Sequence, residues 1–98
     1  MKTYCVYILT SGRNGTLYIG VTSNLSRCLH EHDSEVLHGF TQKYAVKQLV
    51  HVEQFSTMYG AMRREKTLKT WLRSWKLQLI EEHNPTWSDL RGYVGDVS

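Results

Sequence analysis

The chain has 98 residues, enough for one small domain with a modest core. Its net charge is +3 and its pI about 9.0, a basic balance that favours phosphate-bearing partners. Two cysteines are too few for a disulfide framework or a four-ligand zinc site. No stretch approaches the roughly 20 apolar residues of a membrane span, and the N-terminus carries no signal-peptide pattern. We therefore expect a cytoplasmic protein with no membrane association and no disulfide partner.

The first elements in chain order read as a β-hairpin. Residues 4–10 are rich in Tyr, Val, Ile and Leu, which favours a strand. Residues 11–15 then contain Asn14-Gly15, a strong turn signal. Residues 16–21 read as the second strand, and we expect the two strands to pair in an antiparallel manner.

A short helix and a third strand follow. The helix is expected over 25–33, with Asn24 or Ser23 as its N-cap. Residues 34–47 are mixed in composition and are expected to be mostly loop. Alternating polarity over 49–55 predicts the third strand.

The second half of the chain reads as helical. Ser56 or Thr57 is expected to cap a long helix, and Ser74 marks a kink or a fresh start. The pattern ends at Asn84-Pro85, because the residue before a proline avoids the helical region. The apolar residues that recur at helical spacing are Met58, Ala61, Met62, Leu68, Leu72 and Trp75.

The element order is therefore β-β-α-β-α-α, an α/β (α+β) class. We expect a small three-stranded sheet, mixed or antiparallel, with helices packed around it. One domain should span 1–90 and a loose C-terminal tail 91–98. Trp87 and Leu90 are the residues near the end of the chain with the apolar surface to pack back.

Positive charge gathers in the helical half. Six of the twelve basic residues lie between positions 63 and 76, and the only acid between Gln54 and Ile80 is Glu65. A solvated helix face normally mixes both signs, so this pattern favours a nucleic-acid contact surface. The residues expected to contact nucleic acid are Arg63, Arg64, Lys66, Lys69 and Lys43.

Glu65 lies three and four residues from Leu68 and Ala61, so it shares the apolar face of the helix. A carboxylate half removed from water costs free energy unless it is paired or binds a metal. One interpretation is an ion pair with Arg64 or another basic neighbour at the edge of the core. The other is a Mg²⁺ ligand, because Mg²⁺ takes one or two carboxylates together with waters and substrate phosphate.

Tyr7 and Tyr18 also have two interpretations. They are strand aromatics that pack on a helix, or phenols that position or deprotonate an attacking water. A tyrosine with its ordinary pKa of about 10 is a poor base, so deprotonation would need a nearby cation or metal. Gly20 either lets backbone or substrate come close or simply ends the strand.

Cys28 and His32 are four residues apart and share one helical face. They could belong to a zinc site, but two ligands are too few and no third is evident. They could also form a Cys–His nucleophile pair. We favour neither interpretation. The other histidines show no metal spacing and are expected at the surface or in loops: His30, His38, His51 and His83.

Five segments together form a recurring pattern over residues 3–90: Val6-Tyr7, Tyr18-Ile19-Gly20, the helix ending His30-Glu31-His32, Arg64-Glu65-Lys66 and Asn84-Pro85. In this order they resemble the GIY-YIG nuclease superfamily. The likeness is closest to the small stand-alone bacterial members that resemble the N-terminal domain of the excinuclease C subunit.

The resemblance implies a three-stranded antiparallel sheet and a one-metal hydrolysis of DNA, as in DNA repair or processing. By that likeness Glu65 would hold Mg²⁺ or Mn²⁺. Tyr7 would orient or deprotonate the nucleophilic water, helped by the metal or by His32. Tyr18 would hydrogen-bond the phosphate or the other tyrosine, and Asn84 would shape the site. The metal would polarise the phosphate and lower the pKa of its water.

The chain departs from the family pattern at two positions. Cys5-Val6-Tyr7 replaces Gly-Ile-Tyr, where small members vary. Cys28 stands where the resemblance implies a catalytic arginine. Arg27 precedes it by one residue, a rotation of about 100° on a helix, so only its length and some helix rotation would bring it near the phosphate.

Loss of a cation that stabilises the phosphate commonly costs ~10²–10³ in rate. Three functions therefore stay open. The first is a Mg²⁺-dependent DNA endonuclease, and the second is a nucleic-acid-binding module without cleavage. The third is a structural domain whose basic helix contacts a protein partner. The DNA substrate and the oligomeric state stay open as well.

Overall fold

The computed structural model of the protein describes residues 3–33 and 48–91, and for residues 31–33 it describes the backbone alone. The elements in chain order are β1 (Tyr4–Thr10), β2 (Leu17–Thr22), α1 (Leu25–Asp33), β3 (Gln48–Phe55), α3 (Met58–Thr70) and α4 (Arg73–His83). The strands form one sheet of order β2-β1-β3, and both pairings are antiparallel. The predicted fold class and element order are confirmed, and the sheet is antiparallel rather than mixed.

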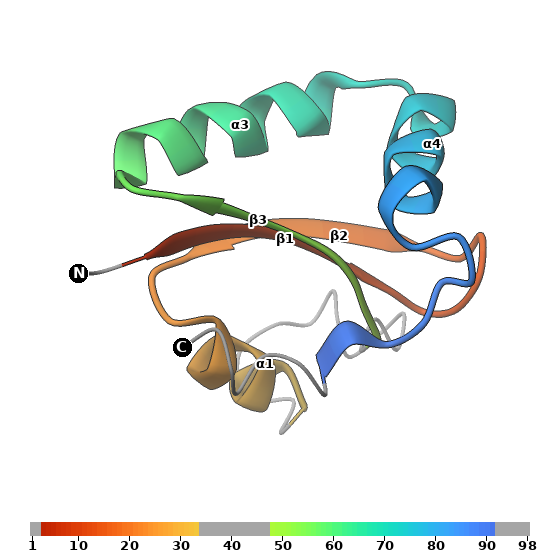
Figure 1. Ribbon diagram of the computed structural model, residues 1–98, viewed down its shortest axis with the longest axis horizontal. Coiled ribbons are helices and arrows are strands. Elements are labelled where there is room, and N and C mark those ends of the chain that lie inside the picture. The colour runs from red at the N-terminus through yellow and green to blue at the C-terminus, as the bar shows by residue number, and fades with distance from the viewer. Residues whose placement is uncertain (1–2, 34–47, 92–98) are drawn as a thin grey trace.

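The sheet is the middle of three layers (Figure 1). Helices α3 and α4 cover one face, and α1 covers the other. Side chains along β1 alternate between the faces. Val6 and Ile8 pack with α3 and α4. Cys5, Tyr7 and Leu9 pack in the cluster that includes α1. The central strand is therefore buried on both faces, and Tyr7 lies on the α1 face.

Side-chain caps fix where two of the helices begin. Thr57 caps α3, since its hydroxyl oxygen accepts a hydrogen bond from the Gly60 backbone N at 3.1 Å. Asn24 precedes α1, and its Oδ1 accepts from the Arg27 backbone N at 3.1 Å. Of the alternative caps considered from the sequence, Thr57 and Asn24 make these bonds.

The β1–β2 turn forms where Asn14-Gly15 predicts it. Asn14 has a φ of 58°, a left-handed conformation that asparagine tolerates. Arg73, at the start of α4, donates to the carbonyl oxygens of Asn14 at 2.8 Å and of Gly15 at 2.6 Å. The guanidinium thus ties the turn to the helical layer.

The apolar stripe predicted for the long helix is only partly correct. Helical geometry stops at Thr70, because Trp71 and Leu72 have extended backbone with ψ of 151° and 149°. The break therefore comes before Ser74, and α4 starts in a new orientation. Ala61 and Leu68 are buried, whereas the exposed members are Met58 at 36 %, Met62 at 48 %, Leu72 at 61 % and Trp75 at 51 %.

The chain beyond α4 packs back onto the sheet. Trp87 is buried, and its indole Nε1 donates to Glu81 at 3.0 Å. Leu90 packs against the α1-face cluster, and Arg91 donates to the Leu29 carbonyl at 3.2 Å. The rest of the predicted tail, and the loop predicted over 34–47, lie outside the described residues. In the described part of the chain no helix has the length and apolar character to cross a membrane.

Candidate active site

Two tyrosines from neighbouring strands meet on the α1 face of the sheet. The ring centroids of Tyr7 and Tyr18 are 6.3 Å apart, with 35° between the ring planes. Tyr7 is the register partner of Gly20 across the β1–β2 pairing. A Cβ on residue 20 would lie 2.5 Å from Tyr7 Cζ, and β2 continues beyond it to Thr22. Gly20 therefore permits close approach of the ring and does not end the strand.

Helix α1 places Cys28 beside Tyr7. The Cys28 Sγ donates to the Tyr7 hydroxyl at 3.1 Å. Burial, followed by the contacts with Cys28 and Tyr18, raises the pKa of the Tyr7 phenol well above its usual value. Burial, followed by the nearby Cys28 and Glu65, also raises the pKa of Tyr18. Both phenols therefore keep their protons at neutral pH.

Glu65 lies on α3, in the opposite layer from α1. Its carboxylate contributes to the raised pKa of Tyr18. The side chain is 19 % exposed and lies 3.5 Å from Lys69 Nζ, one helical turn further on. The basic partner of Glu65 is therefore Lys69 rather than Arg64. Helical ion pairs of this spacing are worth about 0.3–0.5 kcal/mol, so the contact with Lys69 leaves the carboxylate open to a competing cation.

The donor groups fit a divalent cation that keeps most of its water. Within the described ranges, no three His, Cys, Asp or Glu side chains converge in a metal-binding arrangement. Mg²⁺ is usually held by one or two carboxylates, with waters and substrate phosphate completing its shell. The half-buried Glu65 meets that requirement as a single protein ligand.

The other predicted catalytic residues lie on α1 and at the end of α4. Arg27 is exposed on α1, and only the backbone of His32 is described. Asn84 is buried at the end of α4, where its Nδ2 donates to the carbonyl oxygens of Val50 at 3.2 Å and Ser88 at 2.9 Å. Its Oδ1 accepts from the Ser88 backbone N at 3.0 Å. These bonds tie α4 to β3, whereas the roles predicted for Arg27, His32 and Asn84 in chemistry stay predictions.

The cations predicted to contact nucleic acid differ in their surroundings. Arg64 donates through Nε and Nη2 to Glu53 at 2.8 and 3.0 Å and lies over the Trp71 ring at 5.1 Å. Its charge is thus offset by Glu53, which precedes the stretch whose only acid is Glu65. Lys43 lies outside the described residues. The exposed cations on α3 are Arg63, Lys66 and Lys69.

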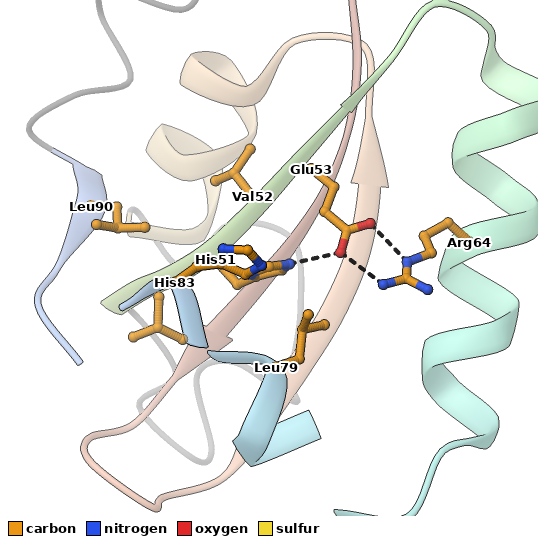
Figure 2. A pocket seen from close by; sticks show the side chains of 8 residues that line it. His51, Val52, Glu53, Arg64, Leu79, His83 and Leu90 are labelled. Carbon is orange, nitrogen blue, oxygen red and sulfur yellow. Dashed lines mark hydrogen bonds and ion pairs between the residues drawn. The ribbon is translucent and has the colours of Figure 1, made fainter. Parts of the chain in front are cut away.

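A second polar cluster lies on β3 and was missed by the sequence analysis. Figure 2 shows Glu53 between Arg64 and His51, whose Nε2 is 2.8 Å from the carboxylate. Burial raises the pKa of Glu53, but the hydrogen bonds from His51 and Arg64 outweigh it and hold the pKa at about 2. The expectation that His51 lies at the surface or in a loop is wrong, because its side chain is 4 % exposed. Its position two residues from Glu53 on a strand is the signal that places both on one face.

The cluster lines a pocket of about 450 Å³ at the side of the sheet. The His51 ring lies 5.7 Å from that of His83 on α4, and Leu79 forms another wall (Figure 2). Since Arg64 and Glu65 are consecutive, the Arg64–Glu53 ion pair holds to β3 the same helical turn that carries Glu65.

The GIY-YIG catalytic domain family matches residues 3–78. A UPF0213 protein from Syntrophus aciditrophicus is 37 % identical over 83 residues, covering 84 % of this chain and 93 % of that protein. A UPF0213 protein from Staphylococcus haemolyticus is 35 % identical over 82 residues, which covers 84 % of this chain and 99 % of that protein. The solution NMR structure of a UPF0213 protein from Bacillus halodurans is 28 % identical, with a TM-score of 0.56 and coverage of 89 % of this chain and 92 % of that one. The chain therefore belongs to the GIY-YIG family and is related to the UPF0213 proteins.

Proposed function

We propose that this protein is a Mg²⁺- or Mn²⁺-dependent endonuclease that hydrolyses DNA phosphodiester bonds in the cytoplasm, in repair or processing of DNA. The observation that carries the proposal is the tyrosine pair of β1 and β2, together with Glu65 of α3, whose carboxylate contributes to the raised pKa of Tyr18. A pair of phenols and a carboxylate on a strongly basic helix suit a phosphodiester substrate, and family membership supports the same chemistry.

The tyrosines act as hydrogen-bond donors in this proposal. The raised pKa of Tyr7 supports orientation of the attacking water or the phosphate rather than deprotonation of the water. The Cys28 thiol donates to Tyr7, so the phenol proton is directed away from the thiol. The Tyr18 ring lies 6.3 Å from that of Tyr7, so it limits how the Tyr7 ring can turn.

Glu65 holds the divalent cation, which when bound supplies Lewis-acid polarisation of the phosphate. Arg27, exposed on α1, is the nearest basic residue in sequence to the position of the implied arginine. We assign His32 to water activation and Asn84 to fixing the end of α4 against β3. Exposed cations of α3, with Arg64 and Lys43, bind the DNA backbone.

A second candidate function is nucleic-acid binding without cleavage. The observation in its favour is that the Cys28 thiol, a group that carries no positive charge, contacts Tyr7 where the family resemblance implies a cation. Without a compensating charge the rate is lower by about 10²–10³-fold. Such a protein still binds DNA, with an affinity that falls steeply with salt.

Incubation of supercoiled plasmid and branched DNA with the protein and Mg²⁺ or Mn²⁺ tests both candidates. We expect slow nicking by the wild type, none by Glu65→Gln and faster nicking by Cys28→Arg. Glu81→Gln is the matched control, because glutamine keeps an acceptor for the Trp87 indole and the residue lies on α4. Nicking that survives Glu65→Gln would remove the proposed metal ligand. If only Cys28→Arg cleaves, the wild type is the non-cleaving module.

A further inference from the structure

An exposed aromatic hollow lies where α3 passes into α4. Trp71 and Trp75 meet edge to face there, with ring centroids 6.1 Å apart and 82° between the planes. The hollow has a volume of about 230 Å³, and Gln78 and Glu82 place polar groups on its wall. It is lined by two indoles, the Leu79 side chain, an amide and a carboxylate, and neither tyrosine of the pair lines it.

The extended backbone at Trp71 and Leu72 creates the hollow. Because the helix breaks there, Trp75 stands in the first turn of α4 rather than on the buried stripe of α3. Its side chain is 51 % exposed, and the neighbouring Leu72 is 61 % exposed. Large apolar groups left together in water on a small domain mark a binding surface.

We propose that this hollow binds an unpaired nucleobase of a nucleic-acid strand. A base presents a flat apolar ring that stacks on indole, and its edge carries donors and acceptors that match Gln78 and Glu82. The volume falls below the roughly 300–1,000 Å³ of pockets that enclose whole drug-sized ligands, which suits one ring system. The inference rests on the proposed DNA function and adds the class of substrate, namely DNA with an unpaired segment.

The charges at the Trp75 end of the hollow favour a nucleic acid. Arg64 already occupies a face of Trp71, and α4 begins with Arg73 and Lys76 and has no acid in its first turn. Leu72 at the N-cap provides no side-chain acceptor for the backbone N–H groups of that turn. The positive end of α4 therefore accommodates the phosphate next to a base on Trp75, whereas Glu82, near the other end of α4, provides an acceptor for the edge of the base.

The hollow and the tyrosine pair lie on different faces of the sheet. Trp71 and Trp75 belong to the segment where α3 passes into α4, which covers one face, whereas Tyr7 and Tyr18 pack on the α1 face (Figure 1). A nucleic acid that contacts both places has to pass an edge of the sheet, which suits a flexible unpaired segment better than a duplex.

Binding without metal separates this proposal from cleavage. We suggest measuring, in EDTA, the affinity of the protein for three probes: a single-stranded oligodeoxynucleotide, the same strand with abasic sites in place of bases, and the paired duplex. Trp75→Ala should weaken binding of the intact single strand about 5- to 100-fold, from the loss of one base-stacking contact. It should change binding of the abasic strand and the duplex less than twofold, because the phosphates remain.

Met62→Ala is the matched control, since Met62 is 48 % exposed on α3 and lies outside the hollow. It should leave all three affinities unchanged. Equal affinity of the wild type for intact and abasic strands overturns the proposal. So does equal weakening of every probe by Trp75→Ala, or Trp75-dependent capture of a lysine-rich peptide in preference to the strand. If nicking depends on Glu65 but Trp75→Ala does not change strand binding, the base-binding proposal fails and the nuclease proposal stands. If Trp75→Ala weakens binding of the intact strand but no nicking occurs, only the nuclease proposal fails.

Discussion

Replacing Gly20 with alanine tests how the tyrosine pair is held. Alanine is ordinarily the better strand residue, so sequence preference alone predicts a neutral or slightly stabilising change. The new Cβ would instead lie 2.5 Å from Tyr7 Cζ and 3.0 Å from its Cε1. Tyr7 is 3 % exposed, with its ring packed between the sheet and α1, so the ring has little room to withdraw.

The expected penalty is about 1–3 kcal/mol, as for other overpacked cores. For a domain of this size that lowers the melting temperature by about 4–8 °C per kcal/mol. Thermal and urea unfolding of Gly20→Ala would be measured beside Gly12→Ala, where a Cβ meets nothing within 4 Å. We expect the Gly12 variant to match the wild type or exceed it.

A double-mutant cycle identifies the cause. In a Tyr7→Ala background the ring is absent, so adding Gly20→Ala should cost close to nothing. An undiminished penalty in that background, or equal behaviour of the Gly20 and Gly12 variants, would refute the reasoning that the ring requires this glycine. The nicking assay should follow the same pattern, because Gly20→Ala moves Tyr7 away from Tyr18.

Further predictions concern titration and buried hydrogen bonds. Because the folded pKa of Glu53 is about 2, below its ordinary 4.5, its stabilisation is complete above pH 4.5 and is lost as the pH falls toward 2. Over that pH range, the free energy of unfolding in urea should fall by about 2–3 kcal/mol more for the wild type than for Glu53→Gln. The same pH dependence in both proteins would contradict the ion-pair network. In alkaline titrations followed by phenolate absorbance, Tyr7→Phe and the wild type should give the same signal until they unfold, because the Tyr7 phenol ionises at higher pH than ordinary tyrosines. A smaller phenolate signal from Tyr7→Phe below the unfolding pH would contradict this prediction. Cys28→Arg should lower the pKa of Tyr7, since a cation favours the phenolate, and Cys28→Ser provides the neutral comparison. Asn84→Ala should destabilise the fold by about 1–3 kcal/mol in urea unfolding by leaving buried partners unpaired, and a loss below 0.5 kcal/mol would rule out the anchoring role.

The fold was predictable because its signals are local. Short runs of β-branched and aromatic residues, the Asn14-Gly15 turn and the Thr57 cap each act within a few residues, so element bounds agree to within one or two positions. The helix break was misplaced because Trp71 and Leu72 carry no glycine or proline signal. Trp71 packs against the core on this face of the sheet while Leu72 is exposed, and periodicity along one helix does not report such a break.

The site was less accessible to the sequence. Spacing alone left Tyr7, Tyr18 and Glu65 with two interpretations each, and only the family resemblance grouped them. The pairing of Glu53 with Arg64 joins a strand to a helix, so it depends on register and helix rotation rather than on sequence distance. Counting charges along the sequence therefore treated Arg64 as a cation available to DNA, although the Glu53 carboxylate offsets its charge.

The arrangement of Arg64 and Glu65 connects the two clusters physically. Arg64 is held to β3 by two hydrogen bonds, whereas Glu65 has one longer contact with Lys69. Adjacent helical residues point about 100° apart, so anchoring one fixes the direction of the other. A metal ion that has to exchange waters for a substrate phosphate is best held by a carboxylate that has a fixed direction but no strong competing partner. Glu53, held by His51 and Arg64, thus has the features of a structural carboxylate. Glu65 is equally exposed at 19 % but only weakly paired, which is what the proposed metal site requires.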